Sequence, residues 1–174
     1  MKIRTAALAG VLFVSGIAVG TAAQKIATPA YRDKPQQDAA FALLSGAKVL
    51  AGKGSWERIA IGRVYYLGGH KAEGQAIFDE VLGNDPDSSD LFRIGRVYRE
   101  AGEWERAKPL LARYADANPK DETQLAEIGA YHLMNGDRAG AEAYYDRAFK
   151  GKSKPEFWAL VAAAGGYLNV APQE

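Results

Sequence analysis

The chain has 174 residues, of which 48% are hydrophobic and 25% charged, with no cysteine and a formal net charge of +1. Such a length and composition are typical of one globular domain. The near-neutral charge gives no basic field for nucleic acid, and the lack of cysteine excludes disulfides, thiolate metal sites and a cysteine nucleophile.

Residues 1–23 have the three-part plan of a secretory signal peptide. Lys2 and Arg4 give a positive start, an apolar run follows over 6–19, and small residues precede Gln24. We therefore expect cleavage near Gln24 and export to a periplasmic or secreted location. An uncleaved membrane anchor is the alternative, although the apolar run is shorter than the roughly 20 residues that span a bilayer. Membrane contact is expected only in that case.

Residues 24–35 lack periodicity and contain Pro29 and Pro35, which predicts a linker. From Gln36 onward, apolar residues recur at helical spacing, and the first predicted helix covers 36–50. We assign residues 36–170 to a helical repeat domain and residues 171–174 to a tail.

A repeated string organises this domain. Ile-Gly-Arg-Val-Tyr occurs at 61–65 and again at 94–98, and the match continues outward with a shift of 33 residues. A weaker third copy begins near Ile128. A period of this length, with helical spacing inside each copy, indicates stacked helix pairs. The first pair is predicted over 55–68 and 71–83.

Glycines divide each pair. Gly69, Gly102 and Gly136 occupy equivalent positions between the two predicted helices of their units, where a left-handed residue ends a helix. A second set, Gly62, Gly95 and Gly129, lies within the first helices, where glycine costs about 1 kcal/mol relative to alanine. We expect close approach of the paired helix at this second set.

Three groups of residues share one pattern. They are Arg58, Ile61, Gly62, Tyr65, Gly74, Phe78 and Pro86; Leu91, Ile94, Gly95, Tyr98, Ala107, Leu111 and Pro119; and Leu125, Ile128, Gly129, His132, Ala141, Tyr145 and Ala148. This pattern resembles the tetratricopeptide repeat family over about residues 55–155. Arg58 departs from the tryptophan or other apolar residue usual at its position, and His132 departs from the usual tyrosine. The resemblance implies an all-α solenoid of three helix pairs, capped by single helices over 36–50 and 155–168.

The repeat phase separates core from surface. Ile61, Tyr65, Phe78, Ile94, Tyr98, Leu111 and Tyr145 are predicted to be core. In the family, the opposite face of each first helix lines a concave groove that binds extended protein segments. Here that face is predicted to comprise Trp56, Ile59, Arg63, Tyr66, Leu67, Phe92, Arg93, Arg96, Arg99 and Glu100, with Ala126, Ala130, Leu133, Met134, Phe157 and Leu160 further along.

The arginines of this face have two interpretations. With the aromatic residues they suit an acidic or carboxylate-bearing partner segment. Alternatively, they form ordinary surface pairs with Glu57, Asp90 or Glu100, which contribute about 0–1 kcal/mol each.

We predict a non-catalytic protein–protein interaction module or scaffold of a bacterial-type cell envelope. No catalytic, cofactor-binding or metal-binding residues are predicted, because the two histidines, His70 and His132, lie in no recognisable motif. One alternative is a membrane-anchored assembly factor that retains residues 1–23. Another is an envelope glycan-associated accessory protein, with Trp56, Tyr66, Phe92 and Trp158 as stacking platforms. A repeat fold alone does not name the partner.

Overall fold

The computed structural model describes residues 28–172, so the predicted signal peptide lies outside the described residues. Within this range the chain is all-α, as predicted, with helices and no strand. Its elements are a short 3₁₀ helix η1 (Thr28–Ala30), α1 (Gln36–Ala51), α2 (Ser55–Leu67), α3 (Lys71–Gly83), α4 (Ser88–Glu100), α5 (Trp104–Ala117), α6 (Glu122–Met134), α7 (Arg138–Phe149) and α8 (Phe157–Tyr167).

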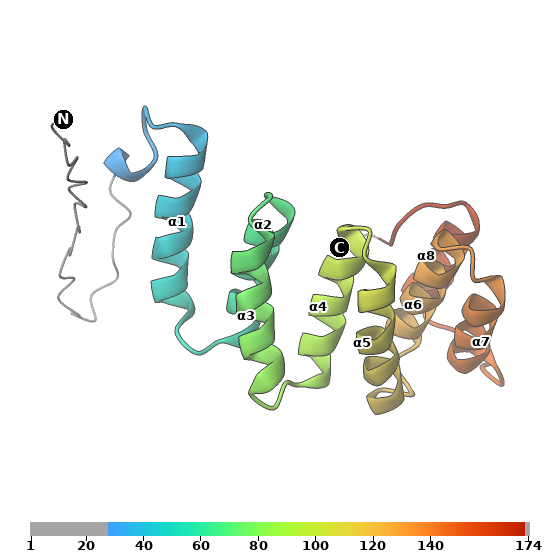
Figure 1. Ribbon diagram of the computed structural model, residues 1–174. Helices are drawn as coiled ribbons and strands as arrows, with labels where there is room; N and C mark the ends of the chain where they lie inside the picture. Colours follow the sequence, from blue (N-terminus) through green and yellow to red (C-terminus); the bar gives the residue numbers. More distant parts are fainter. Residues whose placement is uncertain (1–27, 173–174) are drawn as a thin grey trace, which may run out of the picture.

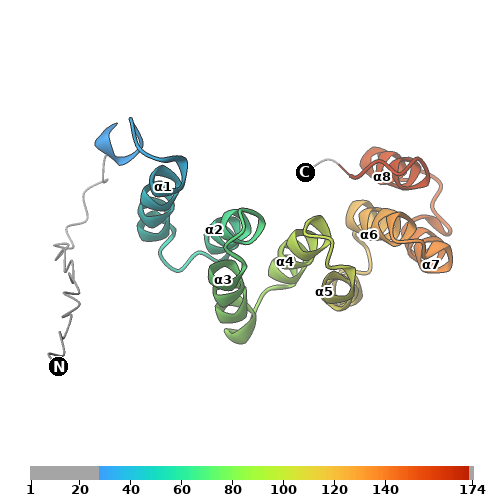
Figure 2. The same cartoon turned by 45° about the horizontal axis from the view of Figure 1, so that its top comes forward.

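The helices form antiparallel pairs that follow one another along an arc (Figure 1). The pairs are α2 with α3, α4 with α5, and α6 with α7. In Figure 2 the first helices α2, α4 and α6 lie on the inner side of the arc, and α3, α5 and α7 lie on the outer side. The predicted solenoid of three helix pairs is therefore confirmed.

Turn glycines end the first helix of each pair, as the sequence predicts. Gly69, Gly102 and Gly136 have φ values of 90°, 76° and 78°. The amide after each turn bonds back into the helix, for example from His70 N to the Tyr65 carbonyl at 2.8 Å. This is the hydrogen bond of a Schellman-type helix end, which requires the left-handed conformation that glycine adopts most easily.

The second set of glycines permits close helix packing, which confirms that prediction too. A Cβ atom on Gly62 would lie 2.6 Å from the Phe78 ring, and one on Gly129 would lie 2.5 Å from the Tyr145 ring. Large residues of the second helix therefore fill the space that each glycine leaves.

The core confirms all but one of the predicted positions. Ile61, Phe78, Ile94, Tyr98, Leu111 and Tyr145 are buried. The prediction is wrong for Tyr65, which is only partly buried. It lies at the interface with α1, where the centre of its ring is 5.9 Å from that of Phe41. No residue of α1 is buried. The single helix α1 therefore covers this end of the solenoid less completely than a full helix pair would.

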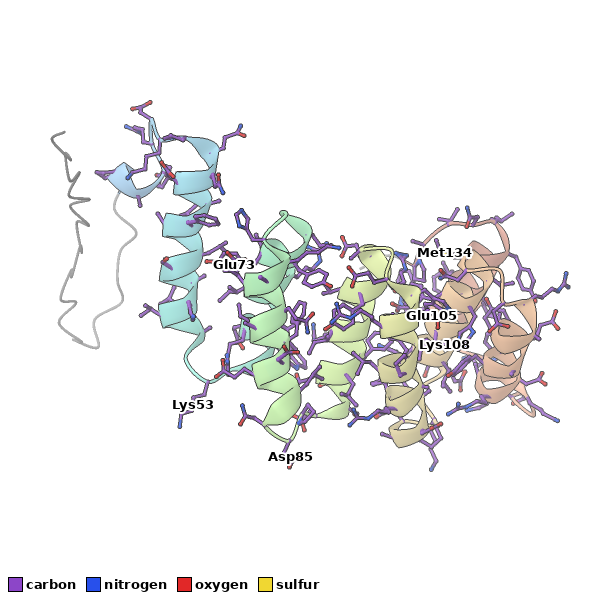
Figure 3. All side chains as sticks on the ribbon, in the orientation of Figure 1. Lys53, Glu73, Asp85, Glu105, Lys108 and Met134 are labelled. Carbon is purple, nitrogen blue, oxygen red and sulfur yellow. The ribbon has the colours of Figure 1, made fainter. Side chains whose placement is uncertain are left out.

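Charged residues cover the outer helices. Figure 3 labels Glu105 and Lys108 on α5, and both are exposed. Among residues 28–172, no helix combines the length and the apolarity that crossing a bilayer requires.

Candidate functional site

A small pocket opens between α2 and α4 on the inner side of the arc. Its volume is about 130 Å³. It brings together five of the residues predicted to line the groove, since its walls are Trp56, Ile59, Ala60 and Arg63 from α2 and Arg93, Arg96 and Val97 from α4.

A cation stacked on an aromatic ring dominates this pocket. The guanidinium carbon of Arg93 lies 3.7 Å from the centre of the Trp56 ring, and the Trp56 indole N–H donates to the Ser89 hydroxyl at 3.4 Å. Within residues 28–172, Arg93 has no carboxylate partner and its Nε is buried without a hydrogen bond. Arg93 is thus a charged, pre-positioned donor on the wall of the pocket.

The other two pocket arginines pair with acids of the next first helix. Arg63 Nε donates to Glu100 Oε2 at 2.8 Å. Arg96 Nε lies 3.2 Å from Oε1 of Glu127 in α6, and Glu127 is buried. The surface-pair interpretation therefore holds for Arg63 with Glu100. The Arg96 partner was missed, because Glu127 belongs to the weakly repeated third unit.

Arg99 lies at the next junction along the groove, between α4 and α6. Its guanidinium carbon lies 4.5 Å from the centre of the Tyr131 ring. The Tyr131 hydroxyl donates a hydrogen bond to Glu127. Burial is the main cause that raises the pKa of Tyr131 well above its usual value, and the negative charge of Glu127 is the second. Arg96 and Tyr131 together satisfy the buried Glu127 carboxylate.

Two aromatic residues predicted to line the groove lie in the core instead. Tyr66 is 2% exposed and packs between Phe78 and Tyr98, and Phe92 is 5% exposed and packs on Tyr114 at 4.7 Å between ring centres. Their placement on the surface is wrong, because the second helix of the same pair covers both rings, and Tyr98 of the next unit also covers Tyr66. Ile59, 3% exposed, is the floor of the pocket.

A polar cluster explains how Tyr66 is held. Its hydroxyl donates a hydrogen bond to Glu103 Oε2 at 2.6 Å and accepts one from Arg106 Nη1 at 2.6 Å. Lys71 Nζ donates to Glu103 Oε1 at 2.6 Å. Hydrogen bonds from Lys71, then Tyr66, lower the pKa of Glu103 to about 2. Burial, with the Glu103 hydrogen bond, raises the pKa of Tyr66 to about 12. The cluster fixes the first unit against the second.

Comparison with protein families agrees with this architecture. The family model described as tetratricopeptide repeat matches residues 60–88 and 91–121, which are the first two helix pairs. Residues 60–121 therefore contain two tetratricopeptide repeats. Neither a comparison with curated proteins nor one with solved structures found a match. Tetratricopeptide repeats are generally protein–protein interaction modules.

The third helix pair differs from the first two, because its groove face is covered. Ala126 and Ala130 are fully buried under α8, and a Cβ atom on Gly166 would lie 2.7 Å from the Ala130 Cα. The prediction that these alanines extend an open groove is wrong. Figure 2 shows α8 stacked on the inner side of α6, so that it stands as a wall at this end of the groove.

The described residues include no cluster of three or more side chains arranged to hold a metal ion. The buried His132 occupies a core position of the third repeat, where its Nδ1 lies 2.8 Å from Asp137 Oδ2 and its ring packs against Trp104. These contacts hold the turn between α6 and α7.

Proposed function

We propose that this tetratricopeptide repeat protein is an exported, non-catalytic interaction module of a bacterial-type cell envelope, which binds an acidic segment of a protein partner. The single observation that carries the proposal is the Arg93 guanidinium, which lies against Trp56 in a groove pocket without a carboxylate partner among residues 28–172.

The chemistry of this pair favours a carboxylate ligand. Hydrogen bonds from arginine to a carboxylate are short and about twice as strong as neutral ones. Stacking on Trp56 fixes the orientation of the Arg93 side chain, which reduces the entropy lost when a ligand binds. Arg63 and Arg96 line the same pocket and add positive potential, although each already contacts a glutamate.

The binding step is tested with a fluorescent peptide that carries two aspartates in a glycine–serine background. Fluorescence anisotropy measures its affinity for the protein without residues 1–23. We expect Arg93→Ala to weaken binding about tenfold, since a charge-assisted hydrogen bond contributes about 1.5–3 kcal/mol. Arg113→Ala is the matched control, because Arg113 is exposed on the outer helix α5. Equal affinities for the aspartate peptide and its asparagine analogue would contradict the proposal.

Export is tested separately, by mass spectrometry of the protein recovered from the cell envelope. A mature N-terminus near Gln24 is expected. Recovery of an intact N-terminus would support the membrane-anchored alternative instead.

A further inference from the structure

The inner surface of the solenoid has two halves of different chemistry. The half between α2 and α4 is cationic and aromatic, as described above. The other half lies at the foot of the α8 wall, where a second pocket of about 710 Å³ opens. Its lining includes Thr123 and Glu127 of α6, Trp158 and Val161 of α8, and Val170 and Pro172 of the following segment.

This second pocket is mainly apolar and accessible. Trp158 is 63% exposed, Val161 46% and Val170 58%, so large apolar side chains face open space rather than the core. Binding pockets for organic groups typically measure about 300–1,000 Å³ and combine apolar walls with few polar groups. The α8 pocket has that size and composition.

One ion pair joins the linings of the two pockets. Arg96 lines the first, Glu127 lines the second, and the two side chains meet at 3.2 Å. Because Arg96 and Tyr131 both contact the Glu127 carboxylate, this junction presents a neutralised acid rather than a repulsive one. A segment that lies along the groove therefore passes from the Arg93 cation to an apolar pocket.

We propose that the groove binds a bipartite segment, with a carboxylate at Arg93 and a large apolar side chain in the α8 pocket. This inference rests on the proposed function, because it assumes that the groove binds a partner segment. The pockets are separated by roughly 1.5–2 helix spacings of about 8–10 Å each. An extended chain rises about 3.3 Å per residue, so the two anchors lie about four to six residues apart.

The test uses synthetic peptides with one phenylalanine and two aspartates, separated by a flexible glycine–serine spacer. The spacer puts the phenylalanine about five residues from the aspartates in the parent peptide and about two residues in a short version. Two further peptides replace phenylalanine with serine, or both aspartates with asparagine. Anisotropy competition measures each affinity.

Two neighbouring substitutions on α8 provide a matched pair. Val161 lines the pocket, whereas Leu160 is 49% exposed and lies outside it. Both are on the surface, so Val161→Asn and Leu160→Asn preserve the core. We expect Val161→Asn to weaken the parent peptide about tenfold and to leave the serine peptide unchanged, with Leu160→Asn within about twofold of the unmodified protein.

The outcomes separate this inference from the proposed function. An affinity that depends on Arg93 but not on Val161, phenylalanine or spacer length overturns the bipartite segment and leaves the proposed binding of an acidic segment intact. Loss of Arg93 dependence, or no binding of any peptide up to about 1 mM, contradicts both.

Two other occupants of the apolar half are checked directly. Analytical ultracentrifugation tests for a second copy, and co-sedimentation with phosphatidylcholine–phosphatidylglycerol vesicles tests for a lipid surface. Self-association that Val161→Asn abolishes, or vesicle binding that Val161→Asn and Leu160→Asn weaken equally, would overturn the proposed peptide pocket.

Discussion

Arg93 of α4 holds its guanidinium carbon 3.7 Å from the centre of the Trp56 ring of α2. This contact joins two successive repeats on the surface where a partner is proposed to bind. Trp56 is 52% exposed, so the pair is accessible to a ligand. The same stack therefore links two units and is also the proposed binding element.

The first prediction concerns the stability of this link. A double-mutant cycle of Trp56→Ala and Arg93→Ala should give a coupling free energy of about 0.5–1 kcal/mol, the range of cation–π pairs at exposed sites. Urea denaturation followed by circular dichroism measures the free energy of unfolding of each variant. A coupling indistinguishable from zero would mean that the stack does not persist in solution.

The second prediction concerns pH and Glu103. The pKa of Glu103 in the folded protein, about 2, lies below the ordinary glutamate value of 4.5. Glu103 therefore contributes stability that is fully present above about pH 4.5 and is lost as the pH falls toward the folded pKa. Glu103→Gln should lower the free energy of unfolding at pH 7 by about 1 kcal/mol, since the group is partly exposed.

The difference between the unmodified protein and Glu103→Gln should shrink between about pH 4.5 and 2. Thermal unfolding across this pH range measures it. Glu105→Gln is the control, because Glu105 is exposed in the first turn of α5, two residues after Glu103 (Figure 3). A difference that stays constant down to pH 2 would refute the role of the Glu103 carboxylate.

Helix boundaries could be predicted because their determinants are local. Gly69 ends α2 in the way the sequence indicates, and Pro86 and Pro119 follow α3 and α5 in the loops. Burial on the inner face could not be predicted in the same way. Tyr66 and Phe92 occupy positions at the boundary between groove and core, and packing against Phe78 and Tyr98 for Tyr66, and against Tyr114 for Phe92, places them in the core.

The buried face of α8 could be predicted from the repeat phase of the sequence. Ala159, Ala162, Ala163 and Gly166 are buried, and they continue the 34-residue phase of Leu125, Ile128, Gly129 and His132. The phase indicates which face of α8 is buried. It does not indicate the neighbour, because no second helix follows α8 within residues 28–172, and this face packs against the small residues of α6.

The third prediction concerns the glycines inside the helices. Gly129→Ala should lower the free energy of unfolding by about 1–3 kcal/mol, because its Cβ atom would lie 2.5 Å from the buried Tyr145 ring. The helix propensity of alanine, worth about 1 kcal/mol, does not offset this clash. Gly83→Ala is the matched control, since no atom lies within 4 Å of the added Cβ. It should be neutral or slightly stabilising in urea denaturation, and equal effects at both sites would contradict the close approach.

The fourth prediction separates the roles of Arg93 and Arg96. Arg96→Ala removes a cation from the buried Glu127, whereas Arg93→Ala breaks no ion pair within residues 28–172. Removing one partner of a buried pair leaves an uncompensated charge, so Arg96→Ala should destabilise the fold by about 2 kcal/mol and Arg93→Ala by less than about 1 kcal/mol. Adding Glu127→Gln to Arg96→Ala should restore part of the lost stability, as measured by urea denaturation. Equal destabilisation by the two single substitutions, or no recovery in the double variant, would show that the Arg96–Glu127 pair does not hold α4 against α6.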